Sequence, residues 1–486
     1  MATDDEDQQQ LKLALELSLQ DVQKDIDEQE REKQDTIAAL AASLGKSVDQ
    51  LTAREVLSVT MGADIQRAPK RPAEDTNSSA APSKKPNTTG DRFWEGAVKL
   101  TYIAGFTDPR AIRIEDIIQK NTLKKAVLTA MVASEEFLET HIPRETNVCL
   151  VMHGPRATSR QVGNRVLITA PMLNSKFGVF HSKLMLLVHD TYMRVVIGSA
   201  NLISFDYRDI ENVVFIQDFP KLQKPVDTLP TFAKDLEDVL DKLRVPASVK
   251  QELYNYDYSK AKAQIVASVS GTFEGADSKN YGHPKLAKIV KSMLSTSDLP
   301  CKPTVEMQTS SLGGLNVGYM NQLYKSFCGI DTIEENRQRK RDQEVPPIKI
   351  VFPSYDTVLN SKLGPSGADT IFFNRSLWQK STFPKQVMHD AVSYREGSLM
   401  HSKYIVATLP RSSNSNIRGW VYLGSHNATQ AAWGSVSISK DSKRPKLTMN
   451  NWELGVVLPI YNEGDIPITF IRPPPPYRPD QEPWIQ

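Results

Sequence analysis

One phrase occurs twice in this chain of 486 residues, and it constrains the fold more than any other feature. Residues 180–201 are FHSKLMLLVHDTYMRVVIGSAN, and residues 400–427 are MHSKYIVATLPRSSNSNIRGWVYLGSHN. Each copy begins with His-Ser-Lys, continues as an apolar segment typical of a buried strand, and ends on Gly-Ser-x-Asn. A single His-x-Lys arises easily by chance on a surface. The same two elements repeated in the same order predict two similar half-molecules that meet at one site.

The repeated phrase supplies the same three kinds of side chain twice. These are an imidazole, an ammonium group and an amide: His181, Lys183 and Asn201, then His401, Lys403 and Asn427. On a strand, residues i and i+2 point to the same face, so each His lies beside its Lys. We expect the Asn at a strand end, where the small Gly and Ser allow close approach. Two such sets around one cavity form a cationic site suited to a phosphodiester in its five-coordinate transition state, with no metal required.

Two imidazoles also suit a displacement in two steps. One attacks phosphorus to form a phosphohistidine, and the other protonates the leaving group and later deprotonates water. The neighbouring lysines favour a neutral nucleophilic His. Residue type alone does not decide which His takes which role.

These repeats resemble the His-x-Lys signatures of the phospholipase D superfamily. Members usually carry an Asp after the Lys, with four residues between them, but here those positions are Val188 and Thr408. Loss of this Asp with retention of His, Lys and Asn resembles the tyrosyl-DNA phosphodiesterase family. The resemblance covers most of residues 93–486 and includes these further segments: Lys176-Phe177-Gly178, Asn280-Tyr281-Gly282-His283, Gln308-Thr309-Ser310-Ser311, Ala431-Ala432-Trp433-Gly434 and Trp452-Glu453-Leu454-Gly455.

The resemblance implies unequal roles for the two copies. His181 is the implied nucleophile and His401 the general acid, then base. The implied phosphate-oxygen ligands are Lys183, Lys403, Asn201 and Asn427. Glu453 would orient one catalytic His from behind. Its counterpart in the first half is Asn212, where relatives have Gln, so the shorter amide puts that hydrogen bond in question.

The resemblance also implies three contacts to DNA. Phe177 would stack on a base, while Ser310 and Ser311 would contact phosphates. The alternatives are a core aromatic and a turn at a strand end.

Apolar segments such as Val148–Met152 and Leu184–Val188 alternate with helical periodicity over Lys125–His141 and Phe232–Leu243. This pattern predicts an α/β fold with mixed sheets covered on both faces. We expect two phospholipase D-like half-domains, residues 93–262 and 263–486, related by pseudo-two-fold symmetry. They follow an arm of residues 1–92.

The arm differs from the rest in charge. Its first 50 residues carry 13 acidic and 5 basic side chains, a net charge of −8, which leaves +10 for the other 436 residues. Within it, Leu11, Ala14, Leu15 and Ser18 share one helical face behind an acidic lead-in. This segment resembles a ubiquitin-interacting motif, and the alternative is a helix that packs on its own domain.

Residues 66–92 are rich in Pro, Ser, Asn and Thr and are typical of a disordered linker. Two basic pairs in it, Lys70-Arg71 and Lys84-Lys85, resemble a bipartite nuclear-import signal, with chance as the alternative.

The three cysteines (Cys149, Cys301, Cys328) are far apart, which indicates reduced thiols in an intracellular protein. No apolar run approaches the roughly 20 residues that span a bilayer.

The sequence therefore predicts a nuclear DNA-repair phosphodiesterase that removes tyrosine, a topoisomerase peptide or another adduct from DNA 3′ ends and leaves a 3′ phosphate. We expect a monomer without a cofactor or membrane association, with ubiquitin as a second partner. The alternatives are a phospholipase D-like hydrolase of lipids or other nucleic acids, and a ubiquitin-binding adaptor.

Overall fold

The computed structural model describes residues 92–154, 156–171, 178–294, 302–335, 344–411, 413, 415–462 and 464–485. These residues belong to one compact unit. Four predicted ubiquitin contacts, Leu11, Ala14, Leu15 and Ser18, lie outside the described residues, as does Phe177. No helix within the described ranges is both long and apolar enough to cross a membrane.

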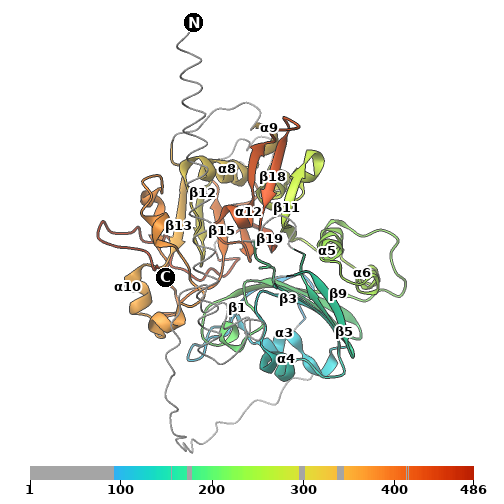
Figure 1. The fold of residues 1–486 in the computed structure, drawn as a ribbon. Coiled ribbons are helices and arrows are strands. Elements are labelled where there is room, and N and C mark those ends of the chain that lie inside the picture. The colour runs from blue at the N-terminus through green and yellow to red at the C-terminus, as the bar shows by residue number, and fades with distance from the viewer. Residues whose placement is uncertain are drawn as a thin grey trace, which may run out of the picture. The chain divides into compact units, whose positions relative to one another are not determined.

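The described strands form three sheets (Figure 1). The first sheet has, in spatial order, β2 (Ala111–Ile112), β1 (Ala97–Thr101), β9 (Val213–Pro220), β8 (Tyr192–Gly198), β7 (Leu184–Val188), β3 (Lys125–Ala130), β4 (Asn147–Met152), β6 (Arg165–Thr169) and β5 (Thr158–Val162). The second has β10 (Gln264–Ser268), β19 (Glu453–Ile460), β16 (Gly419–Gly424), β15 (Tyr404–Thr408), β12 (Thr304–Gln308), β13 (Ile348–Phe352) and β14 (Met388–Asp390). A small third sheet has β11 (Gly271–Glu274), β18 (Pro445–Met449) and β17 (Ser435–Ile438).

The two large sheets contain the same arrangement of seven strands. The order β1-β9-β8-β7-β3-β4-β6 in the first corresponds to β10-β19-β16-β15-β12-β13-β14 in the second. In both, the first four pairings are antiparallel and the last two are parallel. The predicted mixed α/β fold with a repeated unit is therefore confirmed. Each copy of the repeated phrase forms the central hairpin of its sheet, β7–β8 or β15–β16.

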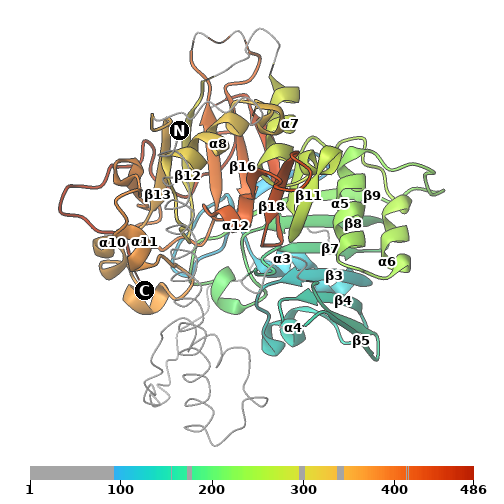
Figure 2. The ribbon, with the colours of Figure 1, turned by 45° about the horizontal axis from the view of Figure 1, so that its top comes forward.

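Helices surround these sheets (Figure 2). The described α-helices are α3 (Ile114–Ile118), α4 (Glu135–His141), α5 (Thr231–Lys242), α6 (Ala247–Glu252), α7 (Gly282–Met293), α8 (Val317–Phe327), α9 (Thr332–Glu335), α10 (Tyr355–Leu359), α11 (Arg375–Trp378) and α12 (Gln430–Trp433). Short 3-10 turns are η2 (Lys120–Thr122), η3 (Ser204–Tyr207), η4 (Leu253–Asn255), η5 (Gly275–Lys279), η8 (Gly364–Gly367) and η9 (Lys385–Val387).

The apolar side chains of the central hairpins face two cores at once. In β7, Leu184 and Leu186 join a cluster shared by both large sheets and α5, whereas Met185 and Leu187 join a cluster with α3 and α4. In β15, Tyr404 and Val406 join the shared cluster, and Ile405 and Ala407 pack with α7 and α8. Burial on both faces explains why these strands are continuously apolar.

The predicted helix over Lys125–His141 is wrong in its first half. Lys125–Ala130 is strand β3, which lies between β7 and β4, and only Glu135–His141 forms a helix. The segment is rich in helix-forming residues, but every β3 residue after Lys125 is buried. Packing on both faces of the sheet overrides the local helix propensity.

Candidate active site

The two halves are joined where the repeated phrases begin. Phe180, before His181, forms a bridge with Trp452, before Glu453, and the His181 N–H donates to the Trp452 carbonyl at 2.9 Å. The second half repeats the arrangement, since the His401 N–H donates to the Glu211 carbonyl at 2.8 Å. Each catalytic candidate therefore lies against a segment of the opposite half.

The glycine of each Gly-Ser-x-Asn permits a close approach of strands. A Cβ atom on Gly198 would lie 2.5 Å from the Val213 carbonyl oxygen, and one on Gly424 would lie 2.4 Å from the Cα of Gly455. These distances are shorter than non-bonded carbon contacts allow, so a side chain at either position would push the strands apart. The structure thus supplies the reason for the glycine that the sequence repeats.

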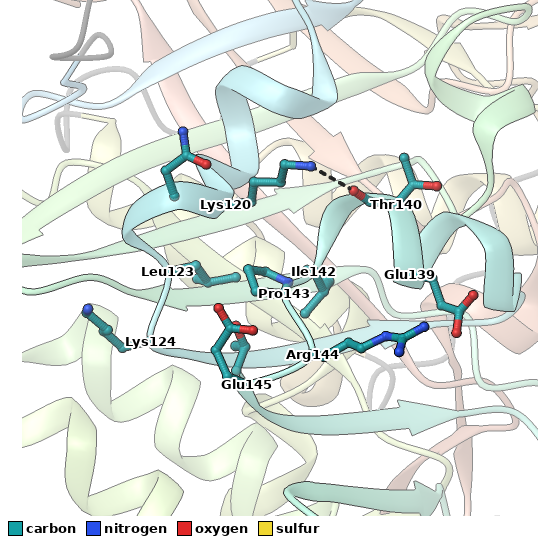
Figure 3. A pocket seen from close by; sticks show the side chains of 11 residues that line it. Lys120, Leu123, Lys124, Glu139, Thr140, Ile142, Pro143, Arg144 and Glu145 are labelled. Carbon is teal, nitrogen blue, oxygen red and sulfur yellow. Dashed lines mark hydrogen bonds between the residues drawn. The ribbon is translucent and has the colours of Figure 1, made fainter.

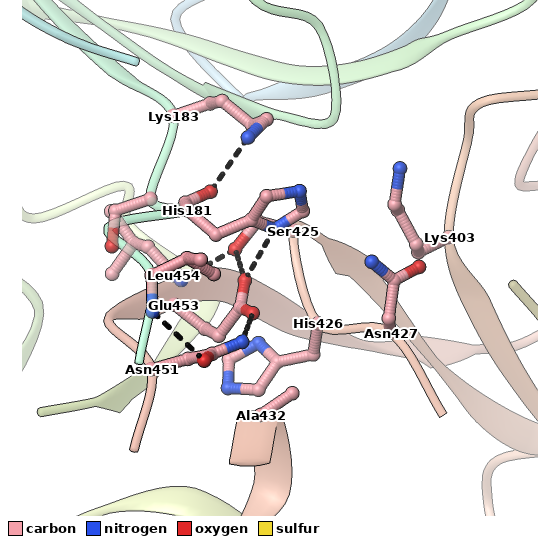
Figure 4. A network of polar contacts seen from close by, with 12 residues as sticks. His181, Lys183, Lys403, Ser425, His426, Asn427, Ala432, Asn451, Glu453 and Leu454 are labelled. Carbon is pink, nitrogen blue, oxygen red and sulfur yellow. Dashed lines mark hydrogen bonds and ion pairs between the residues drawn. The ribbon is translucent and has the colours of Figure 1, made fainter. Parts of the chain in front are cut away.

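His181 is held by a carboxylate from the other half. Its Nδ1 lies 2.8 Å from Glu453 Oε2, as the dashed line in Figure 4 shows. The Ser425 hydroxyl donates to the same oxygen at 2.5 Å, and Asn451 Nδ2 donates to Glu453 Oε1 at 3.0 Å. With Nδ1 occupied, the Nε2 atom of His181 is the nitrogen left to react.

His401 is held in the same crossed manner, but by an amide. Its Nδ1 lies 3.1 Å from Asn212 Oδ1, which also accepts from the Ser199 hydroxyl at 2.7 Å. Asn212 Nδ2 donates to the Asp206 carbonyl at 3.0 Å. The hydrogen bond that the shorter Asn side chain put in question is therefore present.

Two buried lysines complete the cationic set. Lys183 Nζ donates to the His181 carbonyl at 2.8 Å, and Lys403 Nζ donates to the His401 carbonyl. Burial lowers the pKa of Lys183 to about 8 and lowers that of Lys403 well below its ordinary value, with Lys183 adding to the second shift. A substrate anion would favour the charged form of both.

Burial favours the neutral form of both imidazoles. Burial lowers the pKa of His181 to about 4, and the two lysines add to this shift against the opposing effect of Glu453. Burial, Lys403 and Lys183 lower the pKa of His401 well below its usual value. For Glu453, burial raises the pKa, but His181 and the Ser425 hydrogen bond outweigh it and bring the value to about 2. The pKa of His181 is thus shifted in the direction expected for a neutral nucleophile, although burial contributes more to this shift than the lysines do.

The two asparagines are fixed by their surroundings. Asn427 Oδ1 accepts from the Thr309 hydroxyl at 3.0 Å, the Ser310 hydroxyl at 3.3 Å and the Ser311 N–H at 3.1 Å. Since these donors occupy Oδ1, the Nδ2 group is the part of the Asn427 amide left to bind a phosphate oxygen. Ser310 and Ser311 thus support Asn427, and their direct contact with DNA stays a prediction.

The first asparagine depends on a residue that the sequence did not single out. Asp206 lies five positions after Asn201, and its Oδ2 accepts from the Asn201 backbone N–H at 2.6 Å and from Asn201 Nδ2 at 3.2 Å. The Ser residues of the two Gly-Ser-x-Asn elements, which hold Asn212 and Glu453, were also given no role. Their presence in both copies was the available signal.

A pocket of about 470 Å³ lies beside the segment that precedes β3, and its lining includes no residue of the repeated phrases. Figure 3 shows the side chains that line it. Its lining combines three basic with two acidic side chains: Lys120, Lys124, Arg144, Glu139 and Glu145. Its charges partly cancel, and the described lining contains no imidazole or thiol. Among the described residues, no group of three or more His, Cys, Asp and Glu side chains is placed to hold a metal ion.

Comparison with known proteins identifies the family of this chain. A family model for tyrosyl-DNA phosphodiesterase matches residues 97–470. A probable tyrosyl-DNA phosphodiesterase of Caenorhabditis elegans is 24% identical over 86% of this chain and 96% of its own length. Tyrosyl-DNA phosphodiesterase 1 of Arabidopsis thaliana is 26% identical over 73% of this chain, but the alignment spans only 60% of the plant protein.

The fold is also similar to a solved structure. The crystal structure of yeast tyrosyl-DNA phosphodiesterase superposes with a TM-score of 0.59 at 17% identity, covering 80% of this chain and 100% of the yeast chain. The family model covers well over half of the sequence and contains all six residues of the repeated phrases. This chain belongs to the tyrosyl-DNA phosphodiesterase family.

Proposed function

We propose that this protein removes tyrosyl and other adducts from DNA 3′ ends and leaves a 3′ phosphate. The observation that carries the proposal is the crossed arrangement of the histidines. Each Nδ1 is bound by a side chain of the opposite half, so each Nε2 is available beside two buried lysines. Membership of the family supports DNA as the substrate.

The chemistry follows in two displacements. In the first, His181 Nε2 bonds to phosphorus while the bond to the tyrosyl oxygen breaks. His401, in the protonated form that the bound anionic substrate favours, donates a proton to that oxygen, although a phenolate with a pKa of about 10 leaves with less help than an alkoxide. In the second, His401 takes a proton from water, the water oxygen bonds to phosphorus, and the bond to His181 breaks. The neutral state of His401 suits this basic role.

The assay is cleavage of an oligonucleotide with a 3′-phosphotyrosyl end in the presence of a chelator. We expect full turnover of this substrate and none of phosphatidylcholine. Turnover of the lipid alone would indicate a lipid hydrolase instead. Inactivity on both substrates by a folded chain would refute the proposal.

The assignment of roles has a separate test. His401→Asn should slow release of the His181–DNA intermediate more than its formation, so covalent DNA accumulates. This covalent DNA should not form in the double variant that also carries His181→Ala. His389→Asn, a change to a partly buried histidine bonded to the Val387 carbonyl, serves as a matched control and should behave as the wild type. Equal loss of both steps in His401→Asn would contradict the assigned roles.

We further propose that the arm binds ubiquitin and directs the protein to the nucleus. The small Ala14 and Ser18 on one helical face support ubiquitin binding, and the basic pairs near Lys70 and Lys84 support nuclear import. Replacing Ala14 and Ser18 by Leu should abolish binding in a titration with labelled ubiquitin, and unchanged binding would remove this role. Alanine at both basic pairs should leave a fluorescently tagged chain in the cytoplasm, and unchanged nuclear accumulation would contradict the import signal.

A further inference from the structure

The carboxylate of Asp206 lies between two parts of the site, and neither step of the proposed mechanism uses it. Asp206 belongs to turn η3 and is completely buried. Its Oδ2 accepts hydrogen bonds from the backbone N–H and from Nδ2 of Asn201, and it lies 3.6 Å from Nδ1 of His401. The aspartate therefore faces the side of His401 that Asn212 also contacts.

The two histidines differ in the charge of their partners. His181 contacts a carboxylate directly, at 2.8 Å, whereas His401 contacts an uncharged amide. In the second displacement His401 accepts a proton from water and becomes a cation in a buried site. The charged or titratable groups that face it are Lys403 on its own segment, Lys183 and His181 before β7, and Asp206 after β8. Of these, Asp206 alone supplies negative charge.

We propose that Asp206 is a positioning residue that balances the positive charge of His401 whenever this imidazole holds a proton. The inference rests on the proposed function and assigns to this carboxylate the task that Glu453 performs for His181. Asn212 orients the ring, and Asp206 contributes the charge that an amide lacks. The nearby carboxylate makes His401 a stronger base towards the attacking water.

The surroundings of Asp206 fit an ionised group. Burial raises its pKa to about 6, against the opposing effects of the Asn201 N–H groups and both lysines, so the carboxylate is charged at neutral pH. Its second oxygen, Oδ1, is buried without a hydrogen-bond partner among the described residues. Buried side-chain oxygens usually accept at least one hydrogen bond. Asp206 leaves an oxygen unbonded in a site with two lysines and two imidazoles.

Asp206→Asn tests the charge, because an amide oxygen can still accept the Asn201 N–H. Formation and hydrolysis of the His181–DNA intermediate are measured separately by rapid quench, with a 3′-nitrophenyl phosphodiester oligonucleotide that needs no proton for its leaving group. We expect hydrolysis to fall by about 10- to 100-fold, part of what general-base catalysis contributes. Formation should change by less than about twofold, so the covalent intermediate accumulates.

Asp390→Asn is the matched control. Asp390 is another buried carboxylate, which accepts hydrogen bonds from Ser354 and Thr357 away from the repeated phrases, and its variant should keep the wild-type ratio of the two rates.

The pH profile gives a second readout. Hydrolysis fails at low pH once His401 is protonated, and loss of the carboxylate lowers the pKa of His401. The acidic limb should therefore move to lower pH in Asp206→Asn.

Equal slowing of both steps would show that Asp206 only holds Asn201 in place, and unchanged rates would show that it has no role; either result overturns the inference. Should Asp206→Asn not fold, Asn212→Asp adds a carboxylate against His401 and should move the acidic limb to higher pH. An unmoved limb would also overturn the inference. Failure of the wild type to cleave the 3′-phosphotyrosyl end refutes the proposed function instead.

Discussion

Replacing Glu453 by Gln isolates the carboxylate that contacts His181. The pKa of Glu453 falls from 4.5 to about 2, although burial alone would raise it. A hydrogen bond to a charged group contributes about 1.5–3 kcal/mol, and the bond between His181 Nδ1 and Glu453 Oε2, 2.8 Å long, is buried, which favours the upper value. Positive charge develops on this imidazole as Nε2 bonds to phosphorus. Loss of the carboxylate should therefore slow formation of the intermediate by about 100-fold.

The fold has to survive the change for this number to be measured. Gln keeps the shape of Glu but presents an N–H₂ group, which would face the Asn451 Nδ2 donor, 3.0 Å away in the present structure. A buried donor without an acceptor costs about 1–3 kcal/mol. Thermal unfolding of the variant should therefore remain cooperative, with a midpoint temperature below that of the wild type.

Glu306→Gln is the matched control for Glu453→Gln. Glu306 is a buried carboxylate of the same sheet, which pairs with Arg472 at 2.5 Å and lies outside the crossed network. Single-turnover cleavage of the 3′-phosphotyrosyl oligonucleotide measures formation of the intermediate in both variants. We expect the control to stay within about twofold of the wild type. A folded Glu453→Gln that forms the intermediate at the wild-type rate would refute the electrostatic reasoning.

Three further predictions concern the buried parts of the fold. Burial lowers the pKa of His283 to about 3, so its contribution to stability is present above the unfolded pKa of 6.5 and is lost as pH falls towards 3. In urea unfolding below pH 6, the free energy of unfolding of His283→Asn should therefore fall by about 1.4 kcal/mol less per pH unit than that of the wild type. An unchanged slope would contradict this prediction. Gly198→Ala should lower the free energy of unfolding by about 1–3 kcal/mol, because the added methyl group would overlap the Val213 carbonyl oxygen. Wild-type stability of this variant would contradict the close approach of the two strands. Burial raises the pKa of Cys149 to about 11, so iodoacetamide at pH 7.5 should modify it only after unfolding, as mass spectrometry can show.

The repeated phrase allowed the site to be predicted because its chemistry depends on local spacing. His-x-Lys on a strand and an Asn at a strand end have the same geometry in any sheet. The identity of Asn212 and Glu453 as partners came from resemblance, since contacts between the two halves leave no local pattern. The fold class was predictable for a similar reason: continuously apolar segments such as Leu184–Val188 occur where a strand is covered on both faces.

Other features depend on long-range packing. Lys125–Ala130 has a helical composition and becomes a strand because β4 and β7 lie on either side of it. Asp206 was missed because a lone acid in a turn is common in sequence. Its significance comes from the approach of His401, almost 200 residues away in the chain. Neither periodicity nor spacing reports such a contact.

The crossed partners explain how two equal phrases form one site with unequal histidines. Glu453 reaches His181 from the second half and is held by Ser425 of that half; Asn212 reaches His401 from the first half and is held by Ser199. Neither phrase is complete without the other half. The difference between the histidines then lies outside the phrases. A direct carboxylate stabilises a lasting positive charge, as on a phosphohistidine, whereas a neutral amide with a more distant carboxylate leaves a ring free to gain and lose a proton.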